Sequence, residues 1–385
     1  MIVPGAFRLA SLLLAASLCA CSAGTGSTAT GSAGSTGTRT PTPSESGTTT
    51  LQSPPNAASS AVATYQPGPP LDPPVKVAAM DTGIVSNISF YEGIDKGYYR
   101  DEGLDVSLVP LADASTAAQM IAINQVQFYI AIPDPVIFNA LARGINVRIL
   151  VSTTTNKSTD RPAALLVRQD LVDSGRYRTP SDLKGMTIAS GAASAQFYIQ
   201  RALARGGLTL ADVNLVNITA LPDVLAALQN KSVDAGWEVE PLITQAERSG
   251  VARAELTTGQ LYPDAVGAAL IMAPSFEQDH PDAALRFLIA YLRGQRDYYH
   301  ALNKRDTDPG PVVESLTAHT LVKDPNLYQV MGLPSLDPNG DMNPSVWDPF
   351  QDFYVQQGIL QQKIDLTPYM DTALVNAALN RLGRE

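Results

Sequence analysis

Small residues at the start of one helix are the first feature that could do chemistry. A short apolar strand ends at Ala189, the chain continues as Ser190-Gly-Ala-Ala-Ser194, and an amphipathic pattern then predicts a helix over 195–206. The first N–H groups of a helix have no partner inside it and lie at its positive end, so this start could hold an anion or another polar ligand. Small residues also let a helix pack closely on a strand, and the residues alone leave both interpretations open.

The two cysteines lie in a sequence that is typical of export. Arg8 precedes an apolar run that ends in small residues, which predicts a secretory signal peptide over 1–20. Leu18-Cys-Ala-Cys21 resembles a bacterial lipobox, which implies that Cys21 is acylated and becomes the new N-terminus; ordinary secretory cleavage is the alternative. Residues 21–74, rich in Ser, Thr, Gly, Ala and Pro, predict a disordered tether. Acylation would consume the last thiol, so we expect no disulfide and no thiol nucleophile in the mature chain.

Charge and histidine spacing narrow the classes of function. The chain has 37 acidic residues against 27 Lys and Arg, for a net charge of −10, and no basic cluster stands out. Nucleic-acid binding is therefore not expected, and membrane association should come from the lipid. His280, His300 and His319 have no spacing typical of metal ligands. We expect neither a metal nor another cofactor.

Strands rich in β-branched residues alternate with helices, which predicts mostly parallel α/β sheets. The predicted strands form two sets, 75–80, 105–110, 127–132 and 147–152, then 163–168, 186–189, 214–218 and 232–237. The sets echo each other, because a strand, a Pro, a Gly nine residues later and another strand occur at Pro135–Gly144 and again at Pro241–Gly250. The echo predicts two duplicated lobes with a ligand cleft between them, although Pro and Gly also mark ordinary helix ends.

Four segments, in order, resemble the nitrate, sulfonate, taurine and thiamine-precursor group of ABC-transporter solute-binding proteins. Tyr91-Glu-Gly-Ile-Asp-Lys-Gly-Tyr-Tyr-Arg-Asp-Glu-Gly-Leu-Asp-Val106 resembles that group's first helix and turn and is the most specific of the four. The others resemble the start of its second lobe, its Glu-Pro turn at the cleft and its return helix: Ser181-Asp-Leu-Lys-Gly-Met-Thr-Ile188, Val233-Asp-Ala-Gly-Trp-Glu-Val-Glu-Pro241 and His280-Pro-Asp-Ala-Ala-Leu-Arg-Phe-Leu288. The likeness covers roughly residues 75–380.

The resemblance implies a two-lobed α/β fold like that of periplasmic binding proteins, joined by two chain crossings that form a hinge. We place the crossings near 156–162 and 256–262. The first lobe is then 75–161 together with 258–385, and the second lobe is 162–257. A ligand that bridges both lobes would favour a closed form.

The resemblance also implies which residues face the ligand. The helix start at Ser190, Gly191 and Ser194 becomes a cradle for a polar group. Other candidates follow strands on both sides of the cleft: Thr82, Ser86, Asn87, Asp113, Ser115, Asp134, Trp237, Glu238 and Glu240. The loop 111–117 lacks the Gly-rich character usual in the group. Asp134 could instead cap its helix, Trp237 could be structural, and the two glutamates could lie in a solvated turn.

The acids bear on the class of ligand. If several of them line the pocket, an amine-bearing, zwitterionic or heteroaromatic solute fits better than a bare anion, because a buried carboxylate beside an unpaired anion is costly. Lys157 and Arg161 near the first crossing would reverse this choice if they faced the ligand. The candidate solutes are sulfonates or taurine-like molecules, and nitrogen heterocycles such as a thiamine precursor.

We expect a monomeric, lipid-anchored receptor on the outer face of the cytoplasmic membrane that delivers a small-molecule solute to the transmembrane subunits of an ABC permease. It would not be an enzyme. The alternatives are an enzyme on the same scaffold, such as a thiamine-pyrimidine synthase or a desulfinase, and a ligand-sensing adaptor. The desulfinase needs a Cys nucleophile, and the synthase needs a Cys-rich segment and a reactive His in the cleft. The mature chain has no such Cys, and no His falls in a cleft-facing motif.

Overall fold

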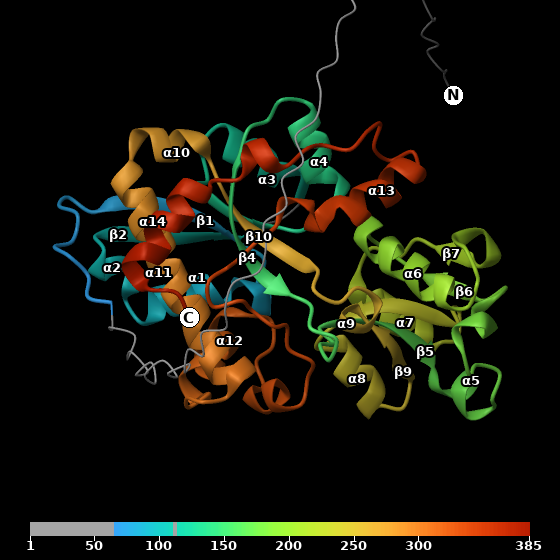
Figure 1. The fold of residues 1–385 in the computed structure, drawn as a ribbon. Coiled ribbons are helices and arrows are strands. Elements are labelled where there is room, and N and C mark those ends of the chain that lie inside the picture. Colours follow the sequence, from blue (N-terminus) through green and yellow to red (C-terminus); the bar gives the residue numbers. More distant parts are fainter. Residues whose placement is uncertain (1–64, 111–113) are drawn as a thin grey trace, which may run out of the picture. The chain divides into compact units, whose positions relative to one another are not determined.

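The computed structural model describes residues 65–110 and 114–385 (Figure 1). The predicted signal peptide, the lipidation site Cys21, most of the tether and Asp113 lie outside the described residues. Within the described part of the chain, no helix is both long and apolar enough to cross a bilayer.

The first of two sheets has five strands in the order β2-β1-β3-β10-β4. Their bounds are β1 Val75–Asp81, β2 Leu104–Pro110, β3 Phe128–Ala131, β4 Arg148–Thr155 and β10 Val266–Met272. β1 runs parallel to β2 and β3, whereas β10 runs antiparallel to both β3 and β4. We call this sheet and the helices on it the first lobe.

The second sheet also has five strands, in the order β7-β6-β8-β5-β9, and with its helices it forms the second lobe. Its strands are β5 Ala163–Arg168, β6 Thr187–Ala189, β7 Asn214–Val216, β8 Ala235–Val239 and β9 Ala252–Thr257. β6 is parallel to β7 and β8, and β5 is antiparallel to β8 and β9. Each strand therefore has a counterpart in the first sheet, with β5 in the place of β10, as the echo in the sequence predicts.

The prediction of mostly parallel sheets is wrong, because half of the strand pairs are antiparallel. The antiparallel pairs all involve β5 or β10, the strands that directly follow the two passages of the chain between the sheets. Each passage brings the chain into the sheet from the opposite direction to its neighbours. The predicted strands do not include β10, which lies between the second crossing and the return helix.

The helices follow from capping residues and apolar spacing. Asp134 accepts a hydrogen bond from Val136 N at 2.9 Å and Pro135 takes the first helical position, so α4 begins there. The helices on the first sheet are α1 Ile88–Asp95, α2 Tyr98–Asp101, α3 Ala114–Ala122, α4 Pro135–Ala142, α10 Pro274–Asp279, α11 Pro281–Tyr298, α12 Gly310–His319, α13 Asp348–Gln356 and α14 Thr372–Leu382. Those of the second sheet and its crossing are α5 Gln169–Asp173, α6 Ala193–Arg205, α7 Leu221–Gln229, α8 Leu242–Arg248 and α9 Thr258–Leu261.

The two passages between the sheets lie side by side. Asn156, directly after β4, donates its backbone N–H to Ala265 O at 2.9 Å and accepts from Asp264 N at 2.7 Å. The first passage thus hydrogen-bonds to the second just before β10. Gly259 N also donates to Asp160 O at 3.3 Å, which ties the start of α9 to the first passage.

The described chain contacts the first lobe before the predicted end of the tether at residue 74. Tyr65 donates its hydroxyl to Glu102 Oε1 at 2.8 Å, and Leu71 N donates to Glu102 O at 3.4 Å. These are the large side chains of an otherwise small and Pro-rich stretch, and they give it enough contact area to be ordered. The ordered body therefore begins before residue 75.

Candidate functional site

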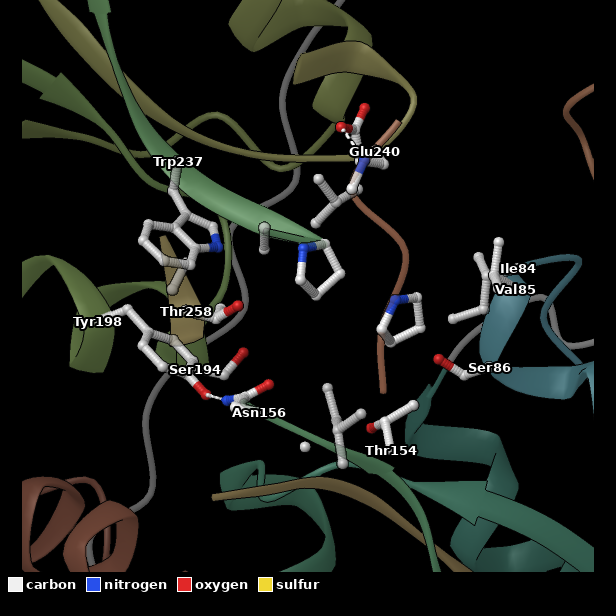
Figure 2. Close-up of a pocket in the computed structure, with 18 of the residues that line it drawn as sticks. Ile84, Val85, Ser86, Thr154, Asn156, Ser194, Tyr198, Trp237, Glu240 and Thr258 are labelled. Atoms are coloured by element: carbon white, nitrogen blue, oxygen red, sulfur yellow. Dashed lines mark hydrogen bonds between the residues drawn. The ribbon is translucent and has the colours of Figure 1, made fainter. Parts of the chain in front are cut away.

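A cavity of about 260 Å³ lies between the lobes, and residues of both sheets line it (Figure 2). Trp237 of β8 and Tyr198 of α6 lie on one side, and Ile84, Val85 and Ser86 lie on the opposite side. Polar side chains are few and placed between apolar ones, which is the usual composition of a pocket for a small organic molecule. Its polar and aromatic lining residues are Ser86, Thr154, Asn156, Ser194, Tyr198, Trp237, Glu240, Thr258 and Phe350.

Two stacked rings form the aromatic wall. The rings of Trp237 and Tyr198 are 5.0 Å apart at their centroids and only 7° from parallel. Asn156 Nδ2 donates to Tyr198 Oη at 3.2 Å, so the first crossing fixes the position of the second lobe's tyrosine. Burial raises the pKa of Tyr198 well above its usual value, and the phenol stays neutral. The wall offers a rigid, uncharged, planar surface.

Glu240 supplies the carboxylate of the pocket, and its oxygens are held by three donors. Oε1 accepts from Gly332 N at 2.8 Å and from Thr244 Oγ1 at 3.0 Å, and Oε2 accepts from Thr244 N at 3.0 Å. Among the described residues that line the cavity, none is Lys, Arg or His. Lys157 and Arg161 lie outside this lining, with Arg161 paired to Glu247.

The loop after β1 contributes one of its three predicted residues to the lining. Ser86 faces the pocket, whereas Thr82 and Asn87 bind each other and Asp81 instead. Thr82 Oγ1 donates to Asn87 Oδ1 at 3.0 Å, and Asn87 Nδ2 donates to Asp81 Oδ1 at 2.7 Å. These bonds shape the short helix Val85–Asn87 that presents Ser86.

The three predicted residues at the start of α6, Ser190, Gly191 and Ser194, do not all face the pocket. Ser194 lines the pocket, but Ser190 is buried away from it. A Cβ on Gly191 would overlap Ile218 O and lie 2.7 Å from Thr219 Cα, so this glycine is required by close backbone packing. Packing therefore explains Gly191, and Ser194 alone of the three lines the cavity that contains Trp237 and Tyr198.

Gly191 and Asp134 instead line a second, mainly apolar cavity of about 560 Å³ next to the first, with Ile132 shared between them. Asp134 caps α4, which was the alternative interpretation, and burial raises its pKa. Glu238 is fully buried and lines neither of these two cavities; burial raises its pKa to about 8. Of the remaining candidates, Asp113 and the side chain of Ser115 are not described. Ser86, Ser194, Trp237 and Glu240 are the predicted residues that the structure brings together.

Sequence reasoning missed several lining residues. Thr154, Asn156 and Thr258 lie at or directly after the ends of β4 and β9, the strands that lead into the two crossings, and the predicted hinge positions could have pointed to them. Tyr198 lies one turn after Ser194 on the same helix. Met331, Gly332, Pro334 and Phe350 come from far along the chain and carry no motif.

The described residues hold no group of three or more His, Cys, Asp or Glu side chains that could bind a metal ion. His300 contacts Asp306 and Glu385, each at 2.8 Å. His319 stacks on Tyr91 and lies 3.0 Å from Asp95. Both imidazoles thus contact acidic side chains on the first lobe, outside the pocket.

The fold and its pocket define a two-lobed α/β scaffold of the periplasmic-binding-protein type. The model of the NMT1/THI5-like family matches residues 86–301, more than half of the chain, and the chain belongs to that family. Among curated proteins, none matches it.

Solved structures share the fold at low sequence identity. The nitrate-binding protein NrtA from Synechocystis PCC 6803 is 16% identical with a TM-score of 0.62, over 81% of this chain and 89% of that one. The alkanesulfonate-binding protein SsuA from Xanthomonas axonopodis pv. citri, bound to MOPS, is 17% identical with a TM-score of 0.58, over 77% and 98%. The desulfurization enzyme DSZB is 16% identical with a TM-score of 0.58, over 80% and 99%. The scaffold thus occurs in both binding proteins and an enzyme.

Proposed function

We propose that this protein is an extracytoplasmic receptor that captures a small organic solute between its lobes and delivers it to an ABC permease without chemical change. The observation that carries the proposal is the pocket between the lobes, with an aromatic wall on one side and a few hydrogen-bonding groups on the other. Membership of the NMT1/THI5-like family and the similar fold of two binding proteins support it. A ligand that touches both lobes would stabilise their closed arrangement.

The ligand we propose is a planar nitrogen heterocycle, neutral or cationic, of the kind represented by a thiamine pyrimidine precursor. The stacked Trp237 and Tyr198 suit a flat ring, and Glu240 suits an amine or a protonated ring nitrogen. A nitrate or sulfonate would lie beside this carboxylate with no cation among the described lining residues, at a large desolvation cost. Sulfonates are therefore the second candidate class of ligand.

The lack of a thiol in the body supports binding over catalysis. The two cysteines are Cys19 and Cys21, so no thiol is available in the pocket for a desulfinase-type nucleophile. The polar groups that line the cavity are hydroxyls, an amide and a carboxylate held by three donors. Such groups bind and orient a ligand.

We also propose that the mature chain is monomeric and anchored through acylated Cys21 on the outer face of the cytoplasmic membrane, with the segment up to the ordered body as a tether. Cys21→Ser should release the protein from washed membranes into the soluble fraction. Retention of this variant after a carbonate wash would contradict the anchor and leave the receptor proposal standing.

Native mass spectrometry of the purified full chain, followed by calorimetric titration, tests the function. We expect a co-purified small heterocycle, and tighter binding of 4-amino-5-hydroxymethyl-2-methylpyrimidine than of taurine or nitrate. Trp237→Ala should weaken the binding by roughly tenfold or more, because the stacking surface is lost. Tyr177→Phe, in the same lobe but outside the pocket, is the matched control. Preferential binding of nitrate or taurine would overturn the ligand class, and binding of no small molecule would overturn the receptor.

A further inference from the structure

The part of the chain after the family match reaches the pocket at two places. The family model ends at residue 301, and we call residues 302–385 the C-terminal segment. Met331, Gly332 and Pro334 of this segment line the cavity from a loop, and Phe350 lines it from α13. The pocket is therefore incomplete without residues that lie outside the family match.

Hydrogen bonds on three sides hold the loop in place. Tyr298 Oη and Asn303 Nδ2 donate to Pro334 O at 2.9 and 3.1 Å. Ser335 accepts from Thr155 N at 2.8 Å and donates its own N–H to Asp160 Oδ2 at 3.1 Å. The loop is thus fixed both to the first lobe and to the first crossing.

The same loop contacts the second lobe inside the pocket. Gly332 N donates to Glu240 Oε1 at 2.8 Å, and a Cβ on Gly332 would overlap the side chain and backbone of Arg161. Only a glycine permits this approach. Met331, the preceding residue, is only 6% exposed and lines the cavity, so its side chain is part of the packed lining.

Phe350 closes the pocket from α13, which lies beside α6 (Figure 1). Its ring centroid is 4.0 Å from that of Phe197 and 5.7 Å from that of Tyr198, and it is fully buried. Tyr354, one turn later, donates its hydroxyl to Pro133 O at 2.8 Å, and Pro133 is itself part of the lining. The segment therefore backs the aromatic wall as well as the opposite side of the cavity.

We propose that the C-terminal segment determines specificity, with Met331 and Phe350 limiting the size of the solute that the pocket admits. This inference rests on the proposed function for its biological meaning. The size limit set by Met331 and Phe350 can nevertheless be tested without a known ligand. The chain's cysteines are confined to positions 19 and 21, so a thiol placed in the pocket by Ser194→Cys is distinguishable by peptide mapping.

The experiment measures how fast N-methylmaleimide and N-phenylmaleimide alkylate the thiol of the full-length Ser194→Cys protein, with the adduct quantified by mass spectrometry. In the parent, the phenyl reagent should react much more slowly than the methyl reagent. Met331→Ala and, separately, Phe350→Leu should raise the phenyl-to-methyl rate ratio several-fold. Val330→Ala, an exposed neighbour outside the lining, should leave it unchanged.

Thermal melts identify which variants fold. If Met331→Ala does not fold, Phe350→Leu still tests the proposal. An unchanged rate ratio in a variant that melts cooperatively contradicts the proposal that Met331 and Phe350 limit the size of the solute. An equal rise in the Val330→Ala control contradicts it as well. A raised rate ratio combined with no bound solute in native mass spectrometry supports the size limit and contradicts the receptor function. Failure of the size limit and failure of the receptor function are therefore distinguishable.

Discussion

The two lobes have the same strand order but are built from different side chains. Large buried rings fill the first lobe, among them Phe90, Phe128, Phe287, Tyr291 and Trp347. The core on one face of the second sheet is aliphatic, made of side chains such as Leu166, Val224, Leu228 and Ile243. One topology is thus compatible with two kinds of core, because the pattern of buried positions, and not the identity of the side chains, decides the fold.

The few aromatic residues of the second lobe lie mostly at the pocket. Residues 162–257 contain four aromatic residues, Tyr177, Phe197, Tyr198 and Trp237. Tyr198 and Trp237 line the pocket, and Phe197 packs on Phe350 of the C-terminal segment. In a lobe whose core needs few rings, three of the four rings therefore lie at or next to the pocket.

The largest effect should come from the first lobe's dependence on rings. Trp347 is fully buried, packs on Phe138 and donates its indole N–H to Val266 O at 2.8 Å. Trp347→Ala should lower the free energy of unfolding by about 3–5 kcal/mol, measured by urea denaturation, because it leaves a cavity and an unpaired carbonyl. Leu321→Ala, at an 83% exposed position, should change it by less than about 0.5 kcal/mol. A loss below about 1 kcal/mol for Trp347→Ala would break the comparison.

Each lobe also contains a fully buried carboxyl group, and these groups should make stability depend on pH. Burial raises the pKa of Glu238 in the second lobe to about 8 and that of Glu92 in the first lobe to about 7, from an ordinary value of 4.5. The folded protein keeps a proton that the unfolded chain loses above pH 4.5, so stability is full at low pH. It falls as the pH rises through this window and levels off above the folded pKa.

Glu238→Gln should therefore remove a loss on the order of 2–3 kcal/mol between pH 5 and 8, and Glu92→Gln a smaller loss that ends near pH 7. Urea denaturation of both variants and wild type from pH 5 to 9 measures the difference. If the variants keep the slope of the wild type across this range, the two carboxyls do not hold their protons in the folded state.

A smaller effect tests the link between the first crossing and the second lobe. Tyr198→Phe removes the acceptor of Asn156 Nδ2 and should cost about 1 kcal/mol in unfolding free energy. Tyr177→Phe is the matched control, because the Tyr177 hydroxyl makes no hydrogen bond to the described residues. Equal losses in the two variants would show that the cross-link adds nothing beyond the removal of a phenol.

Local patterns predicted most elements, and long-range contacts account for what was missed. The β5 strand lies at its predicted bounds, and α6 begins and ends within two residues of the predicted helix 195–206, since short apolar runs are local signals. β10 was missed because its run Val266–Met272 follows a crossing and its antiparallel pairing depends on strands more than a hundred residues earlier.

The pocket residues also separate into those with a local sequence signal and those placed by long-range contacts. Trp237 and Glu240 stand next to a recognisable Glu-Pro turn and were predicted, and both line the pocket. Met331 and Phe350 could not be predicted, because nothing in their local sequence indicates that the chain returns to the pocket there. Glu238 alternates with its neighbours along β8, and the strand's period of two places it on the opposite face from Trp237.

The hydrogen bonds between the two crossings restrict how the lobes can move. Asn156 is bonded to Asp264 and Ala265, so the two connecting segments behave as one joint with a width, and not as two independent threads. Such a joint resists torsion about the line that connects the lobes, because twisting would pull the paired backbones apart. We therefore expect any relative motion of the lobes to be mainly a bend about an axis through both segments, and such a bend would open and close the side of the molecule that carries the pocket.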